Sequence, residues 1–283
     1  MNNKTKSILA MLVSTLGFAL MGVFVKLTGD IPVMQKVVFR TFVIIISTAI
    51  MMRYYKVSLK GIGHFKLLTL RSALGTFGIL LNYYAVDHLI LSDASILFRL
   101  STFLLLLFSW VFLGEKISLK QFLALVLAFI GVLFIVKPQL NIEIVPYLAA
   151  LLGATFAAGA YTVVRVLGPR EEPLVVVFYF AVFTFIVLIP FAIAGYVPMT
   201  LTQVIYATLG GLGAALGQVG VTYAYKHAPA KEVSIYGYFG VIFSAFFSFF
   251  IFDAIPDAFS FLGYVIIFAT AYYMFRENQK DLL

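Results

Sequence analysis

The clearest chemical signal in this sequence is Arg99, a guanidinium within the largely apolar stretch from Asn82 to Glu115. A guanidinium keeps its proton at physiological pH. Its placement at the centre of a helix in lipid costs roughly 2.5–3.5 kcal/mol on insertion scales, and such residues are functional candidates by default. Paired N–H donors suit carboxylates and phosphates. Arg99 therefore predicts an anion-binding site, with anchoring at the membrane surface as the alternative.

Small and polar residues recur at helical spacing around this arginine. Arg99 and Thr102 share one face of their segment, and Gly75, Gly78 and Asn82 share one face of the preceding segment. Two such faces together predict a polar cavity, in which Asn82 and its neighbour Tyr83 would add hydrogen bonds to a bound anion. Arg40 lies a third of the way into the second segment, and the sequence leaves it open between the cavity and the lipid surface.

Four other charged residues are candidates for gating or coupling. Asp93 and Glu232 begin segments, where a carboxylate is favoured by the helix dipole, so helix capping is the alternative. Lys26 and Arg165 end segments, where interfacial anchoring is the alternative. By the predicted spans, no Asp, Glu or His lies within a helix core. We therefore expect facilitated movement or exchange rather than proton-driven transport.

Composition indicates which elements position these residues. The chain has 283 residues, of which 63% are hydrophobic and 11% are charged, against about 25% charged in soluble domains. Ten apolar segments are long enough to cross a bilayer core of about 30 Å as helices. This predicts an all-α membrane protein. The predicted spans are 8–27, 33–53, 68–87, 93–113, 119–136, 144–166, 174–195, 204–225, 232–252 and 258–275.

The basic residues predict the orientation of the chain. With the N-terminus in the cytoplasm, fifteen of the twenty Lys and Arg residues, Arg71 among them, lie on the cytoplasmic side. The net charge of +8 therefore reflects topology rather than nucleic-acid binding. We expect an integral protein of a bacterial-type cytoplasmic membrane, embedded in lipid, with both termini in the cytoplasm. The sequence defines no oligomeric state and is compatible with a monomer.

The two halves of the chain match at one constant displacement, which aligns Gly78 with Gly217 and His88 with His227. Each half holds five spans, an odd number, so the second half enters the membrane inverted, as in many secondary transporters. We predict one repeat over 1–139 and an inverted repeat over 140–283. Tyr238 is then the equivalent of Arg99, and Thr222 that of Tyr83. The predicted substrate-binding residues are Asn82, Tyr83, Arg99, Thr102, Gln218, Thr222, Tyr236 and Tyr238.

Two short motifs and the helix count carry a family resemblance. The fourth span begins near Ser92-Asp93-Ala94 and ends at Gly114-Glu115, and the chain resembles the ten-helix EamA-type members of the drug/metabolite transporter superfamily. The resemblance implies transport of small metabolites such as amino acids, nucleosides, nucleotide sugars or vitamins. It also implies a cavity lined by the third, fourth, eighth and ninth helices, with the first and sixth as gates. Asp253-Ala254 replaces Gly114-Glu115 in the second half, so we interpret the pair as a helix end.

These observations predict a secondary transporter for a small anionic or zwitterionic metabolite, amino-acid-like or nucleoside- or nucleotide-like, that works by alternating access. The alternative is an exporter of organic cations or drugs, with an aromatic cage and proton coupling through Asp93 or Glu232. An intramembrane enzyme is a remote alternative, because it needs clustered catalytic groups at bilayer depth and the sequence has none. We expect no catalytic residue, no cofactor and no metal site. The chain lacks cysteine, and its three histidines lie at span ends.

Overall fold

The structure is a computed structural model that describes residues 3–59, 63–114, 118–136, 144–168, 170–227 and 234–280. These residues form ten α-helices and one short 3-10 helix, and no strand occurs among them. The prediction of an all-α protein is confirmed. The elements are α1 (Asn3–Leu27), α2 (Val33–Tyr54), α3 (Phe65–His88), α4 (Leu91–Leu113), α5 (Leu119–Val136), α6 (Val145–Leu167), α7 (Pro173–Ala194), α8 (Leu201–His227), η2 (Ser234–Tyr238), α10 (Phe239–Phe252) and α11 (Ala258–Lys280).

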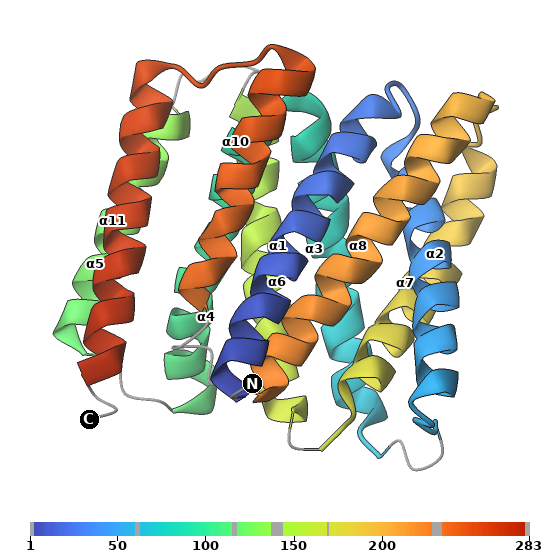
Figure 1. The fold of residues 1–283 in the computed structure, drawn as a ribbon, viewed down its shortest axis with the longest axis horizontal. Helices are drawn as coiled ribbons and strands as arrows, with labels where there is room; N and C mark the ends of the chain where they lie inside the picture. Colours follow the sequence, from blue (N-terminus) through green and yellow to red (C-terminus); the bar gives the residue numbers. More distant parts are fainter. Residues whose placement is uncertain are drawn as a thin grey trace.

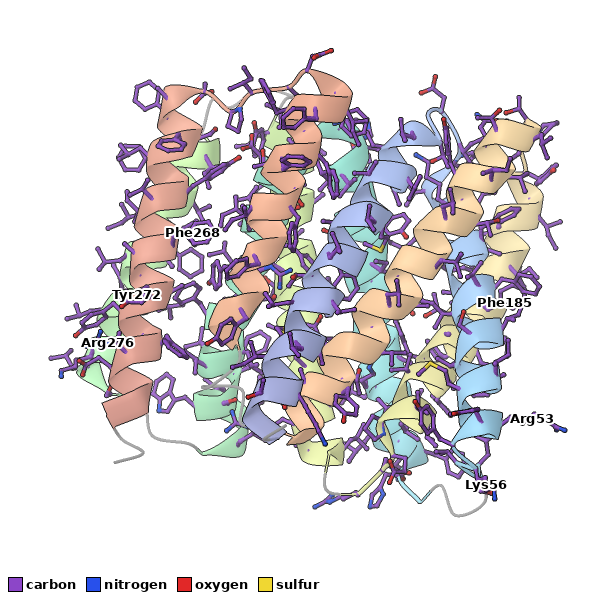
Figure 2. All side chains as sticks on the ribbon, viewed as in Figure 1. Arg53, Lys56, Phe185, Phe268, Tyr272 and Arg276 are labelled. Atoms are coloured by element: carbon purple, nitrogen blue, oxygen red, sulfur yellow. The ribbon has the colours of Figure 1, made fainter. Side chains whose placement is uncertain are left out.

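The helices have the length and the surface of membrane spans. At 1.5 Å per residue, the 22 residues of α2 extend about 33 Å, which exceeds the roughly 30 Å bilayer core. In the part of the chain described, seven helices are long and apolar enough to cross a membrane. Apolar side chains project from the outside of the bundle (Figure 2), and Phe112 and Leu119 are 70% and 73% exposed. Lipid accommodates such a surface, whereas water does not.

Helix directions agree with an inverted repeat (Figure 1). α1 begins and α11 ends at the same lower end of the bundle. α1 runs upward from that end, whereas α6, the first helix of the second half, runs down to it. α1 and α8 cross in the middle of the bundle, α5 and α11 form one edge, and α2 and α7 form the other.

Contacts between helices follow the same displacement that aligns the two halves of the sequence. α1 packs on α8 in the same way as α6, its equivalent, packs on α3. The Ser14 hydroxyl donates to the Gly217 carbonyl oxygen at 2.6 Å. The equivalent residues, Gly153 and Gly78, also touch, because a Cβ added to Gly153 would lie 3.2 Å from the Gly78 carbonyl oxygen. Small residues permit this close backbone approach, and the paired interfaces make the two halves pseudo-symmetric.

The fourth helix of each half ends in the same way. Gly114 and Asp253 follow α4 and α10 in the left-handed conformation, with φ of 67° and 48°. The N–H of each cap donates to the carbonyl oxygen of the equivalent serine, Ser109 or Ser248. Glycine, and less readily aspartate, adopts this conformation. The interpretation of both motifs as helix ends is confirmed for these two residues, while Glu115 lies outside the described residues.

A carboxylate joins the two halves at the lower end of the bundle. Glu171, before α7, accepts hydrogen bonds from the backbone N–H groups of Gly63 and His64 at 3.1 and 3.2 Å. The His64 ring Nδ1 lies 3.0 Å from the same oxygen. Burial acts to raise the pKa of the Glu171 carboxyl, but the His64 ring and these N–H groups together lower it below its ordinary value. The contact ties the loop before α3 to the loop before α7.

Replacing Glu171 with glutamine is expected to lower the unfolding temperature by a few degrees at pH 7, because hydrogen bonds to a charged group contribute about 1.5–3 kcal/mol. A lowered folded pKa stabilises the protein above the ordinary value of 4.5 and loses that effect as the pH falls through the folded value. The difference in unfolding temperature between Glu171→Gln and wild type should therefore become smaller as the pH falls below 4.5. Thermal unfolding in detergent measures this difference, and Asp30→Asn, at an exposed residue, is the control. Equal unfolding temperatures at pH 7 would contradict the expected role.

Candidate functional site

A cavity of about 120 Å³ lies between the helices of the two halves. A water molecule needs about 10–15 Å³, so the cavity has room for a small solute. Its walls come from α1, α2, α3, α4, α6, α7, α8 and α10. The helices named by the family resemblance contribute, and so do both predicted gate helices, α1 and α6. The charged and amide side chains of the wall are Arg40, Arg71, Asn82, Arg99 and Gln218.

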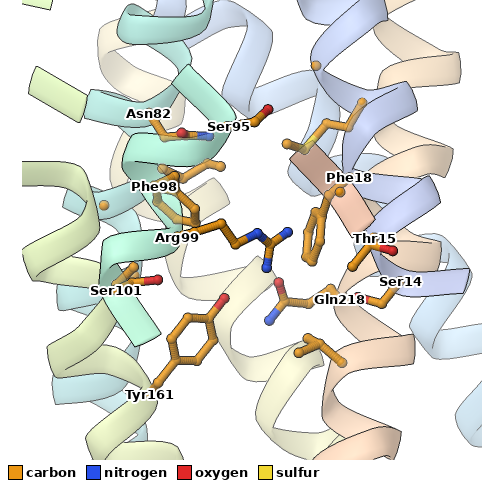
Figure 3. Close-up of a pocket in the computed structure, with 18 of the residues that line it drawn as sticks. Ser14, Thr15, Phe18, Asn82, Ser95, Phe98, Arg99, Ser101, Tyr161 and Gln218 are labelled. Atoms are coloured by element: carbon orange, nitrogen blue, oxygen red, sulfur yellow. The ribbon is translucent and has the colours of Figure 1, made fainter. Parts of the chain in front are cut away.

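Arg99 extends from α4 across this cavity toward Phe18 and Gln218 (Figure 3). Its guanidinium packs on the junction between η2 and α10. A Cβ added to Gly240 would lie 2.8 Å from Arg99 Nη2, and one added to Gly237 would lie 3.1 Å from Nη1. The two glycines therefore leave the space that the guanidinium fills. The side chain lines the cavity rather than reaching a helix end, although its contact with a substrate stays a prediction.

Three further predicted residues line the same cavity. Asn82 and Gln218 lie on opposite sides of Arg99 (Figure 3), and Thr102 lies one turn beyond it on α4. The Ser95 hydroxyl donates to Ser244 at 2.7 Å and joins α4 to α10 beside the cavity. The structure thus brings together amide, hydroxyl and guanidinium groups from both halves, which is a set able to bind a polar anion.

Two predicted residues lie near the cavity without lining it. Tyr83 is buried and faces a second cavity of about 10 Å³ beside Arg40. The Thr222 hydroxyl donates to the carbonyl oxygen of Gln218 at 2.6 Å, within its own helix. Tyr83 and Thr222 are equivalents in the repeat, and neither lines the main cavity in this conformation. Their contact with a substrate stays a prediction.

The two predicted tyrosines of η2 pack against α11 instead. The Tyr236 ring centroid lies 6.3 Å from that of Phe275, and the Tyr238 centroid lies 5.4 Å from that of Phe268. Neither tyrosine lines the main cavity. Tyr238 is the sequence equivalent of Arg99, but its ring lies against α11 rather than in the cavity. A role for either tyrosine in substrate binding stays a prediction.

Two arginines of the cavity wall were not identified from the sequence. Arg40, which the sequence left open, is 2% exposed and lines the cavity. Arg71, which the sequence counts only among the basic residues of the cytoplasmic side, is 3% exposed, and its side chain lines the same cavity. One signal was present: Arg71 stands one turn before Gly75 on the face that continues to Asn82. Among the described residues, the cavity wall holds three arginines and no Asp or Glu.

A buried ionic cluster lies at the upper end, where α1 and α3 end and α2 begins. The Lys26 ammonium donates to the Leu89 carbonyl oxygen at 2.5 Å. The Lys36 ammonium pairs with Asp87 at 2.7 Å, and both side chains are mostly buried. Asp87 also attracts Lys26 electrostatically. The cluster fastens α1 and α2 to the end of α3 in this conformation.

Breaking the Lys36–Asp87 pair is expected to destabilise the fold more than removing both charges. Asp87→Leu alone leaves a buried ammonium without its partner, and such a change costs about 3–5 kcal/mol. The Lys36→Met/Asp87→Leu double variant removes both charges, so its stability should lie close to wild type. A double-mutant cycle on thermal unfolding in detergent measures the coupling. Additive effects of the two single variants would show that the pair contributes nothing.

Of the four gating or coupling candidates, Asp93 is the most deeply buried among the described residues. Its carboxylate accepts a hydrogen bond from the Tyr264 hydroxyl of α11, and it does not line the main cavity. Asp93 lies in the first turn of α4, the position in which the helix dipole favours a carboxylate. Arg165 is exposed and donates to Ser109 at 3.2 Å, and Glu232 lies outside the described residues. Roles in gating or coupling stay predictions.

Comparison with known proteins identifies the family. The model of the EamA-like transporter family matches residues 5–137 and matches again over 144–276. This chain belongs to the EamA-like transporter family. The two EamA matches, which begin at residues 5 and 144, are offset by the same displacement that aligns Gly78 with Gly217. The chain is accordingly an integral membrane transporter and not an enzyme, as predicted. The predicted boundary between 139 and 140 lies outside the described residues.

Relatives of this EamA protein are transporters from bacteria and animals. The pseudopaline exporter CntI of Pseudomonas aeruginosa is 33% identical over 279 residues, which cover 98% of both chains. An uncharacterized transporter of Helicobacter pylori is 26% identical over 267 residues, or 90% of both chains. Human solute carrier family 35 member G1 is 26% identical over 265 residues, covering 87% of this chain and 72% of the relative. A crystal structure that is 16% identical shares the fold, with a TM-score of 0.73 over 98% of both chains.

Proposed function

We propose that this EamA transporter carries a small anionic or zwitterionic metabolite through the cavity between its halves by alternating access. The observation that carries the proposal is the cavity wall, which holds three arginines and, over the described residues, no carboxylate. Fixed positive charges attract an anion and repel a cation at short range in a site of low dielectric constant. The wall therefore favours an anionic substrate over an organic cation.

The proposal also includes outward transport and the absence of proton coupling. The likeness to a protein named a pseudopaline exporter supports outward transport. Among the described residues the wall has no Asp, Glu or His to exchange a proton during the cycle, which supports exchange or facilitated movement. Arg53 and Lys56 lie at the lower end, where α1 begins and α11 ends (Figure 2), which supports cytoplasmic termini.

A thermal-shift experiment on the purified protein tests the substrate class. A ligand that binds the folded state raises the unfolding temperature. Amino acids, carboxylates and nucleotides should raise it at millimolar concentration, whereas quaternary ammonium compounds of similar size should not. Stabilisation by organic cations alone would overturn the proposal.

Transport in proteoliposomes then tests the coupling. Counterflow of the stabilising ligand should proceed at the same rate with and without an imposed pH gradient, because no titratable acid lines the described wall. Strong stimulation by the gradient would contradict uncoupled transport and favour a coupling role for Asp93 or Glu232. Absence of counterflow for every stabilising ligand would count against transport of that class.

A further inference from the structure

Arg40 and Arg71 meet at one aromatic ring in the wall of the cavity. The guanidinium carbon of Arg71 lies 3.9 Å from the ring centroid of Phe180, and that of Arg40 lies 5.9 Å from the same centroid. Both guanidinium groups therefore lie against the same ring. Gly75 leaves room for this arrangement, because an added Cβ would lie 2.8 Å from the ring and 3.3 Å from Arg71 Nη1. Three helices, α2, α3 and α7, thus build one basic wall.

Neither guanidinium of this pair has its hydrogen bonds satisfied. Nε and Nη1 of Arg40 and of Arg71 are buried and have no hydrogen-bond partner. The ion pairs found among the described residues include neither arginine. Buried charges in proteins are normally paired, because a buried donor without a partner keeps its full desolvation cost. Stacking on Phe180 accounts for the position of the guanidinium groups but leaves these N–H groups unsatisfied.

Two like charges that share one ring in a buried site also repel each other. An anionic group between them would relieve the repulsion and accept the free N–H donors in one step. We propose that Arg40 and Arg71 form a second anion-binding subsite beside Arg99, so that the transported metabolite bears at least two anionic groups. This inference rests on the proposed function, because it specifies how many anionic groups the substrate of the same cavity carries.

The two subsites belong to different parts of the protein. Arg99 packs on Gly237 and Gly240 at the η2–α10 junction, whereas the Arg40–Arg71 pair packs on Phe180 of α7. One molecule with an anionic group at each end would therefore join helices that lie on different sides of the cavity. A carboxylate and a phosphate share the oxyanion chemistry that the pair recognises, and the experiment separates the two.

Binding to the purified protein tests the second subsite, with thermal shift and calorimetry as readouts. The probes are butyrate and alanine, which carry one carboxylate, succinate and glutamate, which carry two, and 3-phosphoglycerate, which carries a carboxylate and a phosphate. Wild-type protein should bind the probes with two anionic groups at least tenfold more tightly than those with one. If 3-phosphoglycerate binds and the dicarboxylates do not, the second group is a phosphate, and the subsite stands.

The variants Arg40→Gln and Arg71→Gln locate this preference. Each should lose the tenfold advantage of the probes with two anionic groups while still binding the single carboxylates, which Arg99 accepts. Arg53→Gln is the control, because Arg53 is exposed at the end of α2 and should keep the wild-type preference. Variants must elute as single monodisperse species to be compared. Retention of the preference by both folded variants would overturn the subsite.

Binding of the probes to wild-type protein tests the second subsite even if neither variant folds. Equal affinity for probes with one and with two anionic groups would overturn the second subsite and leave the proposed function standing. Binding of neither kind of probe would overturn both. Binding of organic cations in place of the anions would overturn the proposed function, and the subsite with it.

Discussion

Replacing Arg99 with alanine is expected to reduce transport at least tenfold while the protein stays folded. The guanidinium lines the cavity and packs on Gly237 and Gly240, so truncation removes a charged group from the cavity wall. Hydrogen bonds to a charged group contribute about 1.5–3 kcal/mol, which corresponds to a factor of roughly 10–150 in affinity. Counterflow in proteoliposomes at substrate concentrations below saturation measures the loss.

A second variant moves the guanidinium without removing it. In Gly240→Ala the new Cβ would lie 2.8 Å from Arg99 Nη2, so the side chain must shift, and transport should fall by less than in Arg99→Ala. Arg53→Ala removes an exposed arginine and should transport like wild type. Wild-type counterflow in folded Arg99→Ala would show that this arginine does not bind the substrate.

Replacing Gly213 with leucine is expected to prevent the protein from reaching its folded, monodisperse state. At the crossing of α1 and α8, even a Cβ on Gly213 would lie 2.8 Å from the Gly17 carbonyl oxygen and 2.9 Å from the Met21 nitrogen. Backbone cannot yield as a flexible side chain does. Overpacking typically costs about 1–3 kcal/mol, and a leucine here must separate two helices whose contact depends on small residues.

Size-exclusion chromatography and thermal unfolding in detergent measure the effect of Gly213→Leu. Gly195→Leu is the matched control, because Gly195 is exposed after α7 and an added Cβ would meet only the Phe191 carbonyl oxygen, at 3.5 Å. The control should elute and unfold close to wild type. If Gly213→Leu gave the same monodisperse yield and unfolding temperature as the control, the close crossing of α1 and α8 would not be needed for folding.

Much of the architecture follows from properties of single segments. Hydropathy and length predicted ten helices, and nine of the predicted spans begin within five residues of the start of an observed α-helix. The ninth predicted span corresponds to η2 and α10, and its first residues lie outside the described part of the chain. The displacement between the two halves predicted that Gly114 and Asp253 end equivalent helices, and both adopt the left-handed conformation. Arg99 was found because a charge in a long apolar run stands out in the sequence.

The choice among neighbouring polar residues depended on packing between segments. Asn82 and Tyr83 are adjacent in sequence, but successive residues of a helix point about 100° apart, and only Asn82 lines the main cavity. Lys36 and Asp87 lie 51 residues apart, and their pairing depends on how α2 packs beside the end of α3.

The sequence by itself determined the membrane class, the helix count, the repeat and one cationic candidate in the cavity, because hydropathy and periodicity belong to each segment alone. The role of Arg71 needed the tertiary structure. A basic residue near a predicted helix end has the same sequence pattern whether it faces the cytoplasm or a cavity. The difference arises from Phe180, which is distant in sequence and whose ring holds Arg71 beside Arg40 in the wall of the site.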